Sequence, residues 1–263
     1  MKTTLFSTTL IVLSTLIGCT QAEQDIPLTT TPLSPTPASL STPSREADVT
    51  LSASFDGISF TVPLSSSPSL DGLLNPGEWD KAVRQEFNGN GELYLMHNGE
   101  NLFLGIHQDG EDHIITTVFL GYDEEIFALH SSGSLGTAIF KQGEDGWQLT
   151  DPFTWELYGV TTHTITAERQ RQVFFERNGW LANLGSMTDT GEIEYQITIP
   201  GAQFSIAVAY LQPPDFNRAS WWPSELTDDC LNVNFLQGNS GENLDIPLSL
   251  QFLPETWTLF TIP

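Results

Sequence analysis

Short apolar segments separated by turn residues dominate the chain from about residue 49 onward. Residues 93–96 and 102–106 are two such segments, and the dipeptide Asn98-Gly99 lies between them. Asn-Gly between two hydrophobic segments is a strong signal for a tight β-hairpin, because both residues tolerate positive φ. Residues 114–120 form a nearly continuous run of apolar and β-branched side chains. This run indicates a central strand that is covered on both faces.

The second half of the chain contains further predicted strands. Residues 192–199 alternate strictly between polar and apolar side chains, so we expect a strand with one solvent-exposed face and one buried face. Residues 231–235 alternate in the same way, and residues 206–211 read as another core strand. No segment has a sustained apolar period of 3.6 residues. The pattern therefore predicts an all-β domain, an antiparallel β-sandwich with two sheets of the immunoglobulin or jelly-roll kind.

The N-terminus carries a single short hydrophobic run instead. Lys2 precedes a mostly apolar stretch at 5–17, which is shorter than the roughly 20 residues needed to cross a bilayer. The run therefore reads as part of a secretory signal peptide. It ends in Leu-Ile-Gly followed by Cys19, which resembles the lipobox of bacterial lipoproteins. The resemblance implies cleavage before Cys19 and acylation of that residue, palmitate included. The alternative is an ordinary signal peptide in which Cys19 is incidental.

The next segment, residues 20–49, is dominated by Thr, Ser, Pro and Ala. Burial of its few large apolar side chains cannot offset the entropy of ordering it, so we predict a disordered and extended tether. The sequence therefore predicts three parts: a signal peptide at 1–18, the lipidated Cys19 with the tether at 19–48, and a β-sandwich domain at 49–263. Such a protein would be anchored on the extracytoplasmic face of a bacterial membrane, in the cell envelope.

Charge limits the partners of the domain. The chain has 33 acidic and 9 basic residues, for a formal net charge of −24. Such a field repels nucleic acid and anionic lipid headgroups, so neither is expected as a partner. It is compatible with a solvated surface, with divalent cations or with a neutral ligand. Cys230 has no partner for a disulfide once Cys19 is acylated, and it reads as a buried apolar side chain in a monomer.

Four sequence features resemble, in the same order, those of family 9 carbohydrate-binding modules and their wider DOMON-like relatives. That family opens with Asp-Gly, a spacer and Glu-Trp-x-x-Ala; it continues with an aromatic hairpin, a Glu-x-x-Ile-Pro strand and a Trp-Pro turn. The matching features here are Asp71-Gly72 with Glu78-Trp79 and Ala82, then Tyr94-Leu95 with Leu102-Phe103-Leu104, then Glu194 to Pro200, and last Trp222-Pro223. The resemblance covers roughly residues 70–250 and implies the fold more strongly than the ligand.

The opening motif has a structural interpretation. Asp71-Gly72 forms a turn that needs a residue tolerant of positive φ. We expect Trp79 to plug one end of the sandwich as a core residue, with Glu78 accepting hydrogen bonds from backbone donors at the turn. The motif therefore predicts how the domain is closed and leaves the ligand open.

The family resemblance implies a pair of aromatic residues that clamp a sugar at the edge of the sandwich. A flat aromatic ring offers a large apolar area and loses little conformational freedom on binding. Trp180 follows an Asn-Gly pair and Trp221 precedes the Trp-Pro pair, so both are expected in or beside loops. Trp155 lies in the long stretch 137–180, which does not align with the family's loops. These three residues are the candidates for ligand binding, and the alternative for each is an indole packed in the core.

A loop between two predicted strands, residues 109–113, carries three carboxylates. They belong to Asp109, Glu111 and Asp112. Calcium prefers several carboxylate and carbonyl oxygens, and the resemblance implies structural calcium in relatives, so this loop is a candidate calcium site. A solvated loop tip is the alternative.

Signals for catalysis are absent from the sequence. It contains no Gly-x-Ser-x-Gly elbow, no His-Glu-x-x-His helix and no phosphate-binding glycine loop. The histidines are scattered: His97, His107, His113, His130 and His163. We therefore expect a non-catalytic lipoprotein whose domain binds a carbohydrate or glycan.

Two alternatives belong to other classes of protein. Some DOMON relatives hold haem through Met and His, and a haem-binding electron carrier could use Met96, His97, Met187 or His163. The third possibility is a structural or interaction module of a cell-surface assembly without a small ligand.

Overall fold

The computed structural model describes residues 59–87, 91–108, 115–132, 134–158, 164–184, 191–211, 219–223 and 249–263. All of them belong to one compact unit, residues 51–263. The preceding unit, residues 1–50, lies outside the described residues, as do the predicted strand at 231–235 and Cys230. None of the helices within the described ranges is both long and apolar enough to span a bilayer.

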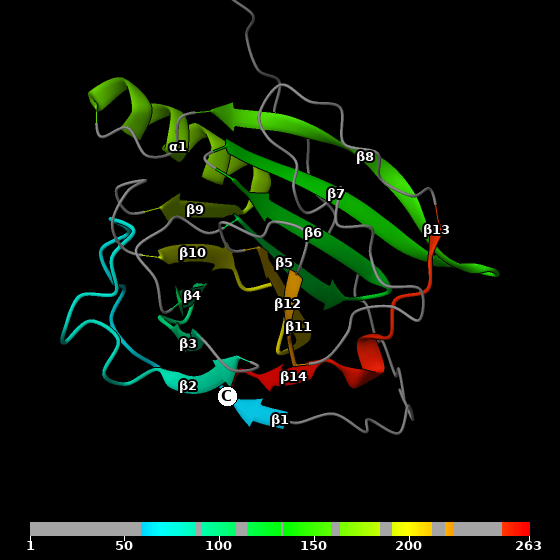
Figure 1. The fold of residues 1–263 in the computed structure, drawn as a ribbon, viewed down its shortest axis with the longest axis horizontal. Coiled ribbons are helices and arrows are strands. Elements are labelled where there is room, and N and C mark those ends of the chain that lie inside the picture. The colour runs from blue at the N-terminus through cyan, green and yellow to red at the C-terminus, as the bar shows by residue number, and fades with distance from the viewer. Residues whose placement is uncertain are drawn as a thin grey trace, which may run out of the picture. The chain divides into compact units, whose positions relative to one another are not determined.

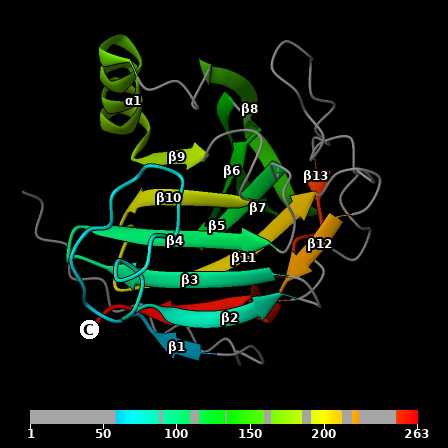
Figure 2. The ribbon, with the colours of Figure 1, turned by 60° about the vertical axis from the view of Figure 1, so that its left-hand side comes forward.

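The domain is a β-sandwich, as predicted, and Figure 2 shows its smaller sheet in front of the larger one. The smaller sheet is antiparallel throughout, in the order β2-β3-β4-β10-β9. Its strands are β2 (Val83–Phe87), β3 (Gly91–His97), β4 (Asn101–Gln108), β9 (Trp180–Leu184) and β10 (Glu192–Thr198).

Within the described residues, the larger sheet has nine strands in the order β1-β14-β11-β5-β6-β7-β8-β13, and β12 pairs with β11 beside β14 (Figure 1). Every pair is antiparallel except β1 with β14. Its strands are β1 (Ser59–Thr61), β5 (Ile115–Tyr122), β6 (Glu125–Ser131), β7 (Ser134–Gly143), β8 (Gly146–Tyr158), β11 (Gln203–Leu211), β12 (Ala219–Trp222), β13 (Ser249–Leu250) and β14 (Thr258–Thr261).

Several predicted elements are confirmed. The Asn98-Gly99 pair connects β3 to β4, and Gly99 has a φ of 99°, which a glycine adopts without strain. Strand β5 lies between β11 and β6 near the middle of the larger sheet, and residues 115–120 are all buried. Its near-continuous apolar run is explained by two different packing layers, one on each face.

The first layer is the core between the two sheets. Alternate residues of β3 and β4, such as Leu95 and Leu104, lie in one cluster with Val118 of β5. The second layer lies on the outer face of the larger sheet, where Phe119 joins Phe252 and Trp257 of the C-terminal segment. Burial of each large apolar side chain contributes about 1.5–3 kcal/mol, so both layers stabilise the sandwich.

The opening motif covers the outer face of the smaller sheet. Trp79 is buried, as predicted, and packs there against Met96 and Phe103, so its expected place at an end of the sandwich was wrong. Gly105 of β4 permits this contact. A Cβ at that position would lie 2.7 Å from Leu74 and 3.2 Å from the Trp79 ring.

The sequence pattern did not reveal the α-helix α1 (Ile165–Asn178). Only Arg171 and Phe174 of this helix are buried, so it has no apolar stripe of period 3.6. Its ends are nonetheless well capped. The Thr164 side chain accepts a hydrogen bond from the backbone of Ala167, and Gly179 ends the helix in the left-handed conformation. Figure 1 shows α1 beside the ends of β8 and β9.

Candidate functional site

Glu194 of β10 is a buried carboxyl that anchors the opening motif. The backbone N–H of Gly72 donates to its Oε2 at 2.8 Å, and the indole N–H of Trp79 donates to its Oε1 at 3.2 Å. Burial raises the pKa of Glu194 to about 8, although these two hydrogen bonds oppose the shift. Strand β10 is confirmed, but its predicted solvent-exposed face is wrong at Glu194, because the opening motif covers that position.

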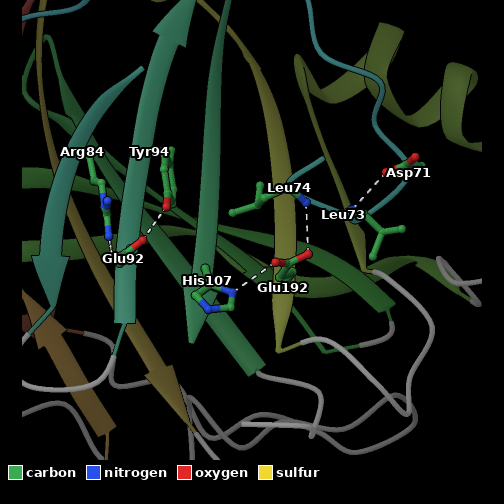
Figure 3. Close-up of polar contacts among 8 residues, drawn as sticks. All are labelled: Asp71, Leu73, Leu74, Arg84, Glu92, Tyr94, His107 and Glu192. Carbon is green, nitrogen blue, oxygen red and sulfur yellow. Dashed lines mark hydrogen bonds and ion pairs between the residues drawn. The ribbon is translucent and has the colours of Figure 1, made fainter. Parts of the chain in front are cut away.

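Neighbouring polar side chains also form hydrogen bonds at the opening motif, as Figure 3 shows. The backbone N–H of Leu74 donates to Glu192 at 3.0 Å, and Nδ1 of His107 lies 3.1 Å from the same carboxylate. Glu78 accepts a hydrogen bond from the backbone of Ser69 at 3.3 Å, as its sequence position predicted. These carboxylates are engaged by the protein's own donors, so this face of the smaller sheet is a structural anchor.

A metal site is not found within the described ranges, where no group of three or more His, Cys, Asp or Glu side chains is arranged to hold an ion. The candidate calcium ligands Asp109, Glu111 and Asp112 lie outside those ranges.

Trp180, one of the three candidate ligand-binding residues, lies in the core rather than in a loop. It begins β9 and is only 2% exposed. Its ring stacks on Tyr195 at 6.0 Å and meets the edge of Phe174 at 5.3 Å, and its N–H donates to Thr137 at 2.9 Å. A ring enclosed in this way has no free face for a ligand.

Trp155 and Trp221, the other two candidates, are half-buried and share one face of the larger sheet. Both belong to a single row of residues that lie directly opposite one another on six adjacent strands. We call it the Trp155–Trp221 row. In order across β12, β11, β5, β6, β7 and β8 it contains Trp221, Ala209, Thr117, His130, Gly136 and Trp155.

The middle of the Trp155–Trp221 row is small and polar. Oγ1 of Thr117 lies 2.7 Å from Nδ1 of His130, and both side chains are buried. The His130 ring meets the edges of Phe153 at 5.9 Å and Trp155 at 5.5 Å. Phe153 and Trp155 are themselves perpendicular at 4.9 Å. A hydrogen-bonded pair therefore lies beside an aromatic cluster at the β8 end of the row.

The adjacent row on the same face is sealed by the C-terminal segment. Phe119 of that row contacts Phe252 at 5.7 Å and Trp257 at 6.2 Å, and Phe140 contacts Phe252 at 5.1 Å. On β11, β5, β6 and β7 the Trp155–Trp221 row lies two residues from the row of Phe119. It is therefore the next row beyond this apolar cover.

The sequence indicated the two tryptophans of the row but not Thr117, His130 or Phe153. One signal was present for Phe153, because residues two apart in a strand project to the same face and Phe153 precedes Trp155 by two. No sequence signal brings Thr117 and His130 to the same row, since this depends on the register of β5 with β6.

Two of the residues suggested for haem ligation, Met96 and His97, project to opposite faces of the smaller sheet. Met96 packs under the opening motif on the outer face of the smaller sheet. His97, its neighbour in β3, projects to the opposite face because side chains alternate along a strand. Met187 and His163 lie outside the described residues.

Comparison with known proteins gives no family model that matches this chain and no similar curated protein. Two solved structures are similar. One is a family 9 carbohydrate-binding module from Caldicellulosiruptor kristjanssonii in complex with cellotriose, with 11% identity and a TM-score of 0.37 over 78% of this chain and 93% of that one. The other is a putative carbohydrate-binding protein from Bacteroides uniformis, with 10% identity and a TM-score of 0.41 over 79% and 100%. Likeness at this level does not establish what this chain binds.

Proposed function

We propose that the domain binds an oligosaccharide across the Trp155–Trp221 row and does not act on it chemically. The observation that carries this proposal is the presence of two half-buried indoles in one row on one face of the larger sheet. The residues between them are buried and would support the indoles without contacting the ligand. Indole rings offer apolar faces to the C–H face of a pyranose, and a neutral ligand suits a chain with a net charge of −24.

The spacing favours an extended ligand over a single sugar. Neighbouring strands lie about 4.8 Å apart, so the five steps from Trp221 to Trp155 span about 24 Å along the sheet. Two rings that clamp one sugar lie much closer, at about twice the contact distance of 4–4.5 Å. The two indoles would therefore contact different residues of one oligosaccharide that runs across the strands.

Substitution of the two indoles tests the proposal. We expect Trp155→Ala and Trp221→Ala each to weaken oligosaccharide binding roughly tenfold, because each removes one stacking surface. The corresponding Phe variants should retain most of the affinity, since a smaller ring remains. Calorimetric titration of the purified full chain with neutral oligosaccharides measures both effects.

Tyr158→Ala provides the matched control, because it removes an exposed ring from the same strand, β8, but not from the row. It should weaken neutral oligosaccharide binding far less than either tryptophan variant does. Equal losses in all three Ala variants, or full affinity in both tryptophan variants, would contradict the proposed site.

We further propose that the domain works as part of a lipoprotein. The lipobox before Cys19 and the Ser/Thr/Pro-rich segment support attachment to the extracytoplasmic face of a bacterial membrane, through acyl chains and an extended tether. A tethered binding domain of this kind would hold extracellular glycan close to the cell surface.

A further inference from the structure

A groove between α1 and the end of β8 forms a second candidate site, remote in sequence from the Trp155–Trp221 row except at β8. We infer that this groove binds a saccharide residue that carries one carboxylate, a uronic acid. The inference concerns a site and a ligand class different from those of the neutral oligosaccharide, and it stands or falls independently of that proposal.

The size and surface of the groove suit a small ligand. Its volume is about 400 Å³, within the range of about 300–1,000 Å³ that is common for small-molecule sites. Tyr158 of β8 and Val173 of α1 line it and are 58% and 56% exposed. Phe174 contributes a buried apolar base. The ring of Tyr158 is thus a stacking surface that the protein itself leaves open.

The groove carries basic side chains, whereas the chain as a whole is strongly acidic. Three of the nine basic residues lie on α1, and two of them, Arg169 and Arg177, line the groove. Arg177 pairs with Glu156 at 2.5 Å. No carboxylate pairs with Arg169 within the part of the chain that the structure describes, and this side chain is exposed. The groove therefore holds one cation in excess.

A single excess guanidinium matches a single carboxylate. Arginine recognises carboxylates through two parallel N–H donors, and the exposed amide of Gln170 adds another donor at the groove. A polyanion would meet strong repulsion from a chain with a net charge of −24, whereas one carboxylate on an otherwise neutral sugar would meet much less. The apolar face of the same sugar would lie against Tyr158. An acidic oligosaccharide with isolated uronic acid residues combines these properties.

Paired ligands that differ only in charge test the inference. The purified full chain is titrated at low salt with a panel of uronic acid oligosaccharides, each beside the neutral oligosaccharide made from it by reduction of the carboxylate to a hydroxymethyl group. We expect at least one acid to bind about tenfold or more tightly than its neutral counterpart, and the preference to shrink with added salt.

Matched variants assign the preference to the groove. Arg169→Gln should abolish the preference for the acid, and Tyr158→Ala should weaken binding of the acid. Arg84→Gln is the control for charge, because it removes another exposed cation, from the smaller sheet. Trp155→Ala should leave the acid preference intact. The inference is overturned if no acid is preferred, if Arg84→Gln matches Arg169→Gln, or if only polyanions or acidic peptides bind.

Discussion

At the residue scale, Glu194 shows how one buried carboxyl attaches a long connecting segment to the sandwich. Its two oxygens accept hydrogen bonds from Gly72 and from the indole of Trp79, which are 122 and 115 residues away in sequence. These bonds favour the ionised form, and burial disfavours it more strongly. The opening motif is therefore attached through the Glu194 carboxyl, whose ionised form is destabilised by burial.

This arrangement predicts a pH dependence of folding. The pKa of Glu194 is about 8 in the folded state and close to its ordinary 4.5 in the unfolded chain. The folded state thus holds a proton that the unfolded chain releases. The associated stability is fully present below pH 4.5, is lost as the pH rises to about 8, and stays lost above it. We expect the effect to be on the order of 2–4 kcal/mol across this window.

Urea unfolding at a series of pH values measures the effect, and Glu194→Gln isolates it. The Gln variant cannot ionise, so its stability should fall much less across the same window. Glu86→Gln, which alters an exposed carboxylate on β2 of the same sheet, should keep the pH dependence of the original chain. Parallel pH profiles for the original chain and Glu194→Gln would contradict a buried carboxyl with a raised pKa.

Single residues differed in how well the sequence predicted them. Trp79 was correctly expected to be buried, because the opening motif gave it a structural context. Trp180 was misplaced, because the Asn-Gly pair before it was read as a loop signal when it marks the end of α1. A Gly at a helix C-terminus and a Gly in a turn satisfy the same need for positive φ, so the dipeptide alone cannot distinguish them.

At the scale of elements, α1 buries only two of its side chains, so we expect its end caps to contribute much of its stability. We expect Thr164→Ala to destabilise the domain by about 1 kcal/mol, since the cap oxygen is lost. Gly179→Ala should cost a similar amount, about 1–2 kcal/mol, because Gly179 has a φ of 70°.

Chemical denaturation of the purified protein measures both losses. Thr166→Ala is the control in the same first turn, since it changes an exposed residue with no capping role. Alanine is the better helix former there, so this change should be neutral or slightly stabilising. Cap variants as stable as Thr166→Ala would mean that α1 is held by other contacts.

Strands with a strong two-residue period or a continuous apolar run were predictable, as β4, β5, β10 and β11 show. Their patterns report burial directly. The polar helix α1 was not predictable. Most of its side chains are exposed, so its sequence lacks the apolar period of 3.6 residues that indicates a helix. The sequence of β10 also could not show that Glu194 is covered, because the cover comes from a segment more than 100 residues away.

At the scale of the whole molecule, the proposed attachment to a membrane depends on Cys19. We expect Cys19→Ala to abolish incorporation of a palmitate analogue and to release the protein from the membrane fraction, because no acyl chain can be added. Metabolic labelling followed by detergent phase partition measures both changes. Cys230→Ala is the control for cysteine number and should remain labelled. Labelled Cys19→Ala protein would contradict the lipobox interpretation.

The candidate site is a property of the whole sheet. Its two indoles are 66 positions apart in sequence, and only the register of six strands brings them into one row. The sequence indicates Trp155 and Trp221 as candidate ligand-binding aromatic residues. It could not pair them, nor place Thr117 and His130 between them, because long-range register is not written in local patterns.

Titration with neutral oligosaccharides of increasing length tests the central proposal most directly. If one ligand crosses the Trp155–Trp221 row, the affinity of the original chain should rise with length until the ligand reaches both indoles, and Trp221→Ala should remove the gain for the longer ligands only. Affinity that does not change with length in either protein, or no binding at all, would contradict the proposed site.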